Sequence, residues 1–356
     1  MDPTEFEALV VGANAEIERP YQDIAAPGGP TPSARPRFEL YHAAPSLCSH
    51  KVRFALAEKG LPFRSHALRI VPAGRAIPHN YRPGYVRLRL AGAPGSNYVS
   101  GFTGRSSVDT EGFDPAVVPT LVDHEATRVI VDSALICDYL DREAGTGPAL
   151  RPASASDAID EQIAIVDRAP HVALLYGANP AGDHRPGLIA RAIRGVHARK
   201  EVALRRAMEK LSDDDTDLRA AYESKIAKER AAARFVASPT SMGTIVGQMQ
   251  EGVEALERSL EKHGGDWACG GELTLADIAW GPSLFRMRWI GIGHLFAPDG
   301  ACPRVAAYAE RLFARPAFRA MVVEWPGAHT PSRHVPEMNT LGFKARAIWH
   351  VLRHGP

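Results

Sequence analysis

Apolar and polar positions divide the chain into two parts with different secondary structure. Residues 38–41 alternate apolar and charged side chains and predict a short strand, and the spacing over 45–59 predicts a helix. Gly60 and Pro62 end that helix, because glycine adopts the left-handed conformation after a helix and proline cannot continue one. Further strands are predicted over 63–71, 117–122 and 128–131, and a helix over 133–143. This order of elements predicts a thioredoxin-like α/β unit.

From about residue 155 the pattern is almost entirely helical. Helices are predicted over 161–176, 196–210, 218–236, 243–263 and 275–295. The pair within 196–236 is strongly charged, so we expect a solvated excursion, with a partner surface as the alternative. Residues 274–277, Thr-Leu-Ala-Asp, form a capping box before the most apolar helix. The predicted fold is an α/β thioredoxin-like N-terminal domain followed by an all-α C-terminal domain.

Segments of irregular composition set the domain boundaries. Residues 1–36 are acidic and then rich in Pro and Gly, which predicts a flexible N-terminal arm. Residues 72–115 hold many Gly, Pro and Ser and little periodicity, which predicts a long loop or an irregular insertion. We therefore expect an α/β domain over 37–150 with the insertion 72–115, a helical substrate domain over 151–325 with an insertion at 177–240, and a C-terminal tail over 326–356.

The C-terminal tail is locally basic. Its charged residues are Arg333, Lys344, Arg346 and Arg353 against Glu337. A helix over 341–353 would place Leu341, Ala345, Ile348 and Leu352 on one face. We expect this apolar face to dock on the helical domain, and weak binding to a membrane surface or a partner is the alternative.

The composition is that of an ordinary globular protein. Of 356 residues 45% are hydrophobic and 23% charged, and the net charge of +1 argues against a dedicated nucleic-acid binder. Acidic first residues and a polar longest uncharged stretch (235–250) favour neither a signal peptide nor a transmembrane segment. The cysteines lie far apart, so we expect no disulfide scaffold, no metal site and a reduced, cytoplasmic compartment. They are Cys48, Cys137, Cys269 and Cys302.

The strongest candidate for chemistry is Cys48, in the run Ser-Leu-Cys-Ser-His-Lys-Val-Arg directly after the first predicted strand. A thiol in the first turn of a helix faces unpaired backbone N–H groups and the positive end of the helix dipole. His50, Lys51 and Arg53 are expected to add positive potential. Each influence favours the nucleophilic thiolate. The alternative is a small buried cysteine that packs the junction of strand and helix.

Two further short runs suggest a binding site. Pro119 interrupts a strand-like run, so it should lie at an edge or a bulge. Ser133 begins a helix whose free N–H groups suit a carboxylate, and Asp132 beside it suits an ammonium group. Together they could hold the two charged ends of an amino acid. Plain helix capping is the alternative.

These residues together resemble the glutathione transferase superfamily from about residue 38 to 324. The resemblance rests on the Ser-Leu-Cys-Ser helix start, the Val-Val-Pro-Thr-Leu strand, the Asp-Ser helix start and the Thr-Leu-Ala-Asp box. The run over 46–53 resembles the maleylacetoacetate isomerase and tetrachlorohydroquinone dehalogenase branch. Segments 85–90, 106–109, 111–114 and 170–177 are similar to reductive dechlorinases of that branch.

The resemblance implies roles for particular residues. It implies that Cys48 is catalytic and that Ser46 holds or activates the thiol of the cosubstrate glutathione. It implies a cis Pro119, pairing of the Val118 backbone with the cysteinyl part of glutathione, and binding of the γ-glutamyl end by Asp132 and Ser133. Asp132 is one methylene shorter than the usual Glu. The candidates for contact with an aromatic substrate are His171, Tyr176, Arg286 and Trp289, each with a structural role as the alternative.

The implied reaction is reductive dehalogenation of chlorinated hydroquinones. It would pass through a glutathionyl-hydroquinone and a Cys48–glutathione mixed disulfide, and would produce oxidised glutathione without a metal. A homodimer is the implied assembly. Aryl-ether cleavage, glutathionyl-quinone reduction, cis–trans isomerisation and a non-catalytic transferase-like binding module stay open as alternatives.

Overall fold

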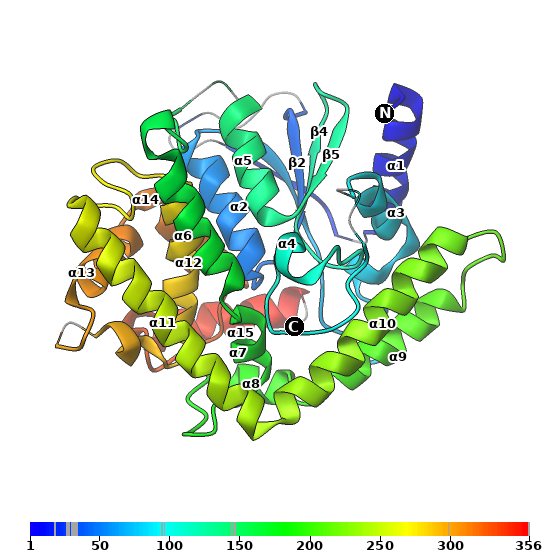
Figure 1. The fold of residues 1–356 in the computed structure, drawn as a ribbon. Coiled ribbons are helices and arrows are strands. Elements are labelled where there is room, and N and C mark those ends of the chain that lie inside the picture. The colour runs from blue at the N-terminus through cyan, green and yellow to red at the C-terminus, as the bar shows by residue number, and fades with distance from the viewer. Residues whose placement is uncertain are drawn as a thin grey trace.

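The computed structural model describes residues 1–17, 19–25, 29, 35–93, 95, 97–143, 145, 147–297 and 299–354. Its described strands form one mixed sheet, ordered β1-β3-β2-β4-β5, with helices on both faces (Figure 1). The strands are β1 (Gln22–Ile24), β2 (Phe38–His42), β3 (Phe63–Ala67), β4 (Thr120–Asp123) and β5 (Arg128–Val131). β2 and β3 pair in parallel because a helix connects them, and the other pairs are antiparallel.

Alternation along the strands assigns each side chain to one of two layers. Leu40 and Leu121 pack with helices α2 (Leu47–Glu58) and α5 (Ser133–Glu143). Their neighbours Tyr41 and Val122 face the opposite layer, which α1 (Pro3–Ala15) and α3 (Pro83–Ala91) form. The structure therefore contains the α/β unit that the sequence predicts, with α2 beginning directly after β2.

Two segments expected to be irregular contain buried helices. Phe6, Val10 and Ala13 lie on one face of α1 and pack against α3, so the prediction of a flexible arm is wrong for Pro3–Ala15. The acidic residues of α1 lie on its exposed side. Because they dominate the sequence of this segment, the short apolar face was not apparent from the pattern. Likewise α3 replaces part of the irregular insertion 72–115. The prediction of a flexible arm is also wrong for Gln22–Ile24, because this strand pairs with β3. The expected arm residues 18, 26–28 and 30–34 lie outside the described part of the chain.

From about residue 155 the chain is helical, as predicted, with some boundaries moved, whereas α4 and η1 lie within the expected irregular insertion. The α-helices are α4 (Val108–Glu111), α6 (Ser156–Arg168), α7 (His171–Tyr176), α8 (Gly187–Ala192), α9 (Val196–Met208), α10 (Thr216–Ala237), α11 (Pro239–His263), α12 (Leu275–Trp289), α13 (Pro303–Phe313), α14 (Pro316–Phe318) and α15 (Leu341–His354). Short helical turns are η1 (His79–Tyr81), η2 (Ala153–Ala155), η3 (Gly293–Phe296), η4 (Arg319–Val323) and η5 (Pro336–Asn339). The helix predicted over 161–176 is interrupted before Pro170, because Ala169 is extended there.

Helices α9 and α10 form an arch, defined here as residues 196–237, that returns to the α/β unit. One face of the arch packs on η1 and α3, and the Tyr222 hydroxyl donates to the Tyr81 carbonyl at 2.6 Å. The expected solvated excursion is therefore wrong for this inner face. Its charged outer face dominated the sequence pattern, whereas Leu218, Tyr222 and Ile226 recur at core spacing.

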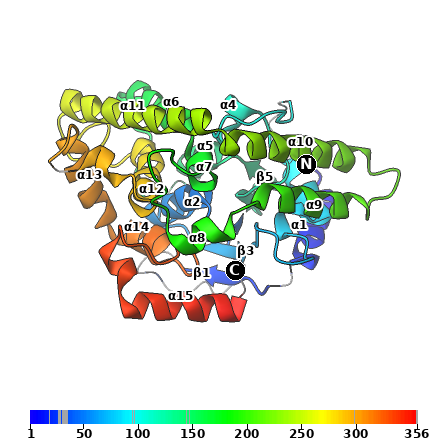
Figure 2. The same ribbon diagram turned by 90° about the horizontal axis from the view of Figure 1, so that it is seen from below.

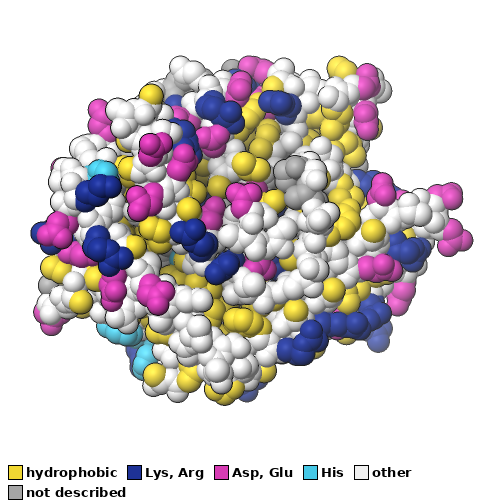
Figure 3. Space-filling view, viewed as in Figure 1, with side chains coloured by type: hydrophobic (Ala, Val, Ile, Leu, Met, Phe, Trp, Pro, Cys, Tyr) yellow, Lys and Arg dark blue, Asp and Glu magenta, His cyan; other side chains and the backbone are white. Residues whose placement is uncertain are grey.

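The surface shows no dominant charge on the face drawn in Figure 3. Basic and acidic side chains alternate over most elements of that face, with hydrophobic side chains between them (Figure 3). This distribution agrees with the near-zero net charge. None of the described helices combines the length and the apolar character needed to cross a membrane.

The C-terminal tail docks by residues other than those expected. Ala328, Val335 and Met338 are buried in the main core. α15 then runs along the side of the molecule opposite α10 and α11 (Figure 2). Leu341 and Ile348 are 86% and 60% exposed, so the predicted docking is wrong for these residues, and the side chain of Leu352 lies outside the described part of the chain. Phe343 packs against the core instead, because the buried stretch before α15 turns that residue inward.

Two truncations separate the buried stretch of the tail from its exposed helix. Removal of residues after Thr340 should lower the free energy of unfolding by about 1 kcal/mol or less, because most of the α15 residues whose side chains are described are exposed. Removal after Gly327 should lower it by about 3 kcal/mol or more, because it also deletes Ala328, Val335 and Met338. Urea unfolding of both proteins measures the difference, and equal losses would contradict it.

Candidate functional site

A cavity of about 200 Å³ lies where the α/β unit, the helical domain and the arch meet. Its lining includes every candidate residue proposed from the sequence except Trp289. These residues are Ser46, Cys48, Val118, Pro119, Asp132, Ser133, His171, Tyr176 and Arg286. The fold thus gathers side chains that are up to about 240 positions apart in the chain.

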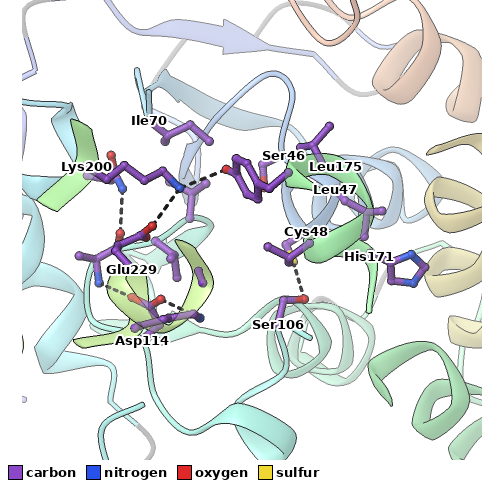
Figure 4. Close-up of a pocket in the computed structure, with 18 of the residues that line it drawn as sticks. Ser46, Leu47, Cys48, Ile70, Ser106, Asp114, His171, Leu175, Lys200 and Glu229 are labelled. Atoms are coloured by element: carbon purple, nitrogen blue, oxygen red, sulfur yellow. Dashed lines mark hydrogen bonds and ion pairs between the residues drawn. The ribbon is translucent and has the colours of Figure 1, made fainter. Parts of the chain in front are cut away.

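Cys48 is the cysteine of this cavity. It is the second residue of α2, partly exposed, and its Sγ lies 3.5 Å from Ser106 Oγ (Figure 4). Burial raises the pKa of the thiols of Cys137, Cys269 and Cys302, that of Cys269 to about 12, so these three are poor nucleophiles. Position and access therefore favour Cys48 as the reactive thiol.

The basic residues after Cys48 do not act together as expected. His50 is buried and donates to the Ala44 carbonyl, and burial, with the charge of Arg53, holds its pKa well below the usual value. It is therefore neutral near pH 7. Arg53 is directed away, toward the Met321 carbonyl at 2.9 Å. The prediction of added positive charge is wrong for these two, because the period of α2 turns both inward.

Lys51 and Arg286 are the cations near Cys48. Burial lowers the pKa of Lys51, but the charges of Asp167 and Cys48 outweigh it, and the pKa is raised. Burial lowers the pKa of Arg286 to about 10, so it stays protonated near pH 7. Arg286 donates to the Pro45 carbonyl at 2.6 Å, and its buried Nε has no partner among the described residues. Both cations are close enough to Cys48 to interact with it electrostatically.

Ser46 links the start of α2 to the cavity. Its backbone is extended, and its Oγ accepts a hydrogen bond from the Ser49 N–H at 3.3 Å. This is the geometry of a helix N-cap. Because the oxygen accepts, the hydroxyl proton is available to a sulfur atom in the cavity.

The Val118–Pro119 peptide bond is cis, which confirms what the resemblance implies. Val118 lies just before β4, and its backbone groups make no backbone hydrogen bond within the part of the chain that the structure describes. They are therefore available to an extended peptide that lies along the cavity wall.

Asp132 and Ser133 lie at the start of α5 on the same wall. Asp132 has a positive φ of 72°, and its carboxylate accepts from the backbone N–H groups of Val108 and Ala134. Asp132 therefore caps α5 and holds the start of α4. The Ser133 hydroxyl is left without a hydrogen bond among the described residues. A buried hydroxyl at a helix start suits a carboxylate ligand.

The candidates for aromatic contact lie in different surroundings. His171 lines the cavity, but Ser283 Oγ lies 3.0 Å from its Nε2, and burial lowers its pKa to about 3. Tyr176 lines the cavity with its hydroxyl accepting from Lys200 at 3.2 Å. Trp289 lies away from the cavity, because its indole N–H donates to the Thr330 carbonyl in the core. We do not retain Trp289 as a substrate contact.

One side of the cavity holds a buried cluster of charged residues that the sequence pattern did not predict. Lys225 and Lys228 contact Asp114 at 2.7 and 3.0 Å, and Lys225 also contacts Glu229 at 3.1 Å. Lys200 lies 3.6 Å from Glu229. Figure 4 shows Asp114, Glu229 and Lys200 across the cavity from Cys48. The sequence feature that could have predicted this cluster is the position of charged residues on the apolar face of α10.

The electrostatics of this cluster keep its members charged. Burial raises the pKa of Asp114 and Glu229, but the neighbouring lysines outweigh it and the pKa of each carboxyl is lowered. Burial lowers the pKa of Lys200 and Lys228, but the carboxylates outweigh it and both are raised. The described residues contain no group of His, Cys, Asp and Glu placed to hold a metal ion.

Comparison with known proteins gives matches over both parts of the chain. Residues 45–143 match the family model "Glutathione S-transferase, N-terminal domain", and residues 196–311 match "Glutathione S-transferase, C-terminal domain". The chain is 44% identical over 339 residues to 2,5-dichlorohydroquinone reductive dechlorinase of Sphingobium indicum, covering 92% of this chain and 96% of that one. It is 24% identical to human ganglioside-induced differentiation-associated protein 1-like 1, covering 86% and 80%.

Solved structures show the same fold at lower identity. Beta-etherase LigF from Sphingobium sp. strain SYK-6 has a TM-score of 0.53 and 19% identity, covering 80% of this chain and 98% of that one. Glutathione S-transferase III in its apo form has a TM-score of 0.52 and 18% identity, covering 82% and 98%. These similarities support the fold alone.

Replacement of Ser133 by alanine tests its role at the start of α5. Ser133→Ala should weaken glutathione binding by about 1.5–3 kcal/mol if the hydroxyl bonds a charged carboxylate. Titration calorimetry measures this change, and Ser156→Ala, at the start of α6 outside the cavity, is the matched control. Unchanged affinity in Ser133→Ala would mean that this residue has no part in binding.

Proposed function

Because the chain belongs to the glutathione S-transferase family and is an enzyme that uses glutathione, we propose that it removes chlorine reductively from chlorinated hydroquinones. The observation that carries the proposal is 44% identity over nearly the whole chain to a protein named for this reaction. The position of Cys48 at the start of α2, open to the cavity, supports it.

The first step of the proposed reaction forms a carbon–sulfur bond. The thiolate of one glutathione attacks the carbon that bears chlorine in a keto tautomer of the hydroquinone, and chloride leaves with the electron pair of its bond. The product is a glutathionyl-hydroquinone. In this proposal Ser46 and Arg286 stabilise the attacking sulfur, and Val118, Asp132 and Ser133 hold the peptide. Their common place in the lining of the cavity supports these roles.

The second step moves the sulfur from carbon to Cys48. The Cys48 thiolate attacks the glutathione sulfur, the carbon–sulfur bond breaks, and the aryl carbon takes the electron pair and a proton. This leaves a Cys48–glutathione disulfide. A second glutathione thiolate then attacks that disulfide, which releases oxidised glutathione and restores the Cys48 thiolate. In sum, two glutathione thiols supply the two electrons that replace chlorine with hydrogen.

We also propose that the protein is a cytoplasmic homodimer. The four free cysteines support a reduced compartment, because a thiol nucleophile must stay reduced between turnovers. Dimeric assembly rests on the family resemblance, and sedimentation of the purified protein tests it.

Product analysis tests the reaction itself. Incubation with glutathione and 2,5-dichlorohydroquinone should release one chloride and one oxidised glutathione for each chlorine removed, because each replacement needs two electrons. Chloride titration and chromatography of glutathione measure both. Turnover of a cis–trans isomer without oxidised glutathione would instead identify an isomerase and contradict the proposal.

Replacement of Cys48 tests its place in the second step. Cys48→Ser should abolish release of the hydroquinone and formation of the mixed disulfide, while glutathione binding persists. Mass spectrometry of the protein detects the disulfide. Cys269→Ser is the matched control, because that residue does not line the cavity. Full reductive turnover by Cys48→Ser would remove Cys48 from the mechanism.

A further inference from the structure

The cluster opposite Cys48 carries an excess of positive charge. Three lysines, Lys200, Lys225 and Lys228, face two carboxylates, Asp114 and Glu229, and all five are buried and line the cavity. Among the residues that line the cavity, these three ammonium groups outnumber the two carboxylates by one, and Glu111 outside the lining also acts on Lys228. An unbalanced buried charge is unfavourable unless a ligand of opposite sign offsets it.

Lys200 is the lysine of the cluster with the longest contact to a carboxylate. Lys225 and Lys228 each have a carboxylate oxygen within 3.0 Å. Lys200 lies 3.6 Å from Glu229, and among the described residues its one hydrogen bond is to the Tyr176 hydroxyl. An ammonium group has three N–H donors. Lys200 is also only 7% exposed, so bulk water does not replace the missing acceptors. Its free donors and the Tyr176 hydroxyl proton are available to a ligand oxygen.

The wall around Lys200 suits an aromatic ring. The Lys200 ammonium lies 4.4 Å from the centre of the Tyr176 ring. Leu175, Ile189 and Phe102 line the same cavity. An apolar wall with a small number of directed polar groups is typical of a site for a small aromatic ligand.

The net positive charge of the cavity lining is larger than the net negative charge of glutathione. Its lining includes the cations Arg89, Arg105, Lys200, Lys225, Lys228 and Arg286 and the carboxylates Asp114, Asp132 and Glu229. Glutathione as the attacking thiolate carries two carboxylates, one thiolate and one ammonium group, and hence two net negative charges, which is one fewer than the net positive charge of these six cations and three carboxylates. The remaining excess favours a second anion beside glutathione.

We propose that Lys200 and Tyr176 form an anion site that binds one ionised hydroxyl of the aromatic substrate. This deepens, and rests on, the proposed function. The ring lies against Leu175 and Tyr176, its phenolate oxygen accepts from Lys200, and the released proton passes to solvent. The cation lowers the pKa of the bound phenol, because an adjacent positive charge favours the phenolate. The site selects phenols over their ethers.

Ligand titration without glutathione tests this site in the full-length protein. The probes are 2,5-dichlorohydroquinone and its dimethyl ether, which has no ionisable hydroxyl. Wild type should bind the hydroquinone more tightly than the ether. Lys200→Met should weaken hydroquinone binding roughly tenfold or more, with ether and glutathione binding unchanged. Lys200→Arg should retain the preference, and the exposed Lys210→Met is the control.

The other outcomes overturn the inference in distinguishable ways. If Lys200→Met weakens glutathione binding and spares the hydroquinone, Lys200 binds the peptide. If it lowers only the melting temperature, Lys200 is structural. If wild type shows no preference for the hydroquinone, no phenolate site exists. Absence of chloride release, with a hydroquinone preference that depends on Lys200, would contradict the proposed reaction and leave this site intact.

Discussion

The buried ion pairs between Asp114 and the two lysines of α10 are the interaction on which the cavity depends. Lys225 and Lys228 would be costly to bury alone, and Asp114 would be equally costly without them. Only when the arch lies against the segment before β4 do Lys228 and Asp114 compensate each other, and Lys225, which also contacts Glu229 at 3.1 Å, then gains a second carboxylate. The pairs therefore fix the position of α10, and with it the wall that carries Lys200 and Glu229. Buried pairs of this kind contribute more to specific geometry than to net stability.

The start of α2 is held by a different means. Arg53 donates to the carbonyls of Met321, Ala43 and Ala44, and it stacks on Trp325 at 4.6 Å. Met321 and Trp325, at the end of the helical domain, thus stabilise the strand-to-helix turn that presents Cys48. A guanidinium suits this role because it offers five donors in one plane. The thiol is in this way positioned by contacts on the side of α2 away from the cavity.

Local pattern was enough for some features and not for others. Strand, turn and helix near Cys48 follow from alternation and from Gly60 and Pro62, all within a short window. The same holds for Ser133. The prediction of a solvated arch was wrong because Lys225 and Glu229 have the pattern of surface charges in the sequence. The buried partner of Lys225 is Asp114, which lies more than a hundred residues earlier. A short stretch of sequence never contains both Asp114 and Lys225, so a local pattern cannot predict their contact. His50 is a similar case, since only the packed structure shows that it is neutral.

The charge balance of the cluster also constrains which substitutions such a protein can accept during evolution. Asp114 belongs to the stretch between α4 and β4 and the two lysines belong to α10, and their buried charges compensate each other. A lineage that lost Asp114 by a single substitution would leave Lys228 without the carboxylate that it contacts and Lys225 with Glu229 alone. Survival would then require a second change in α10, so the two stretches are expected to be gained, altered or lost together. A chimera that takes one stretch from a distant relative should carry the other as well.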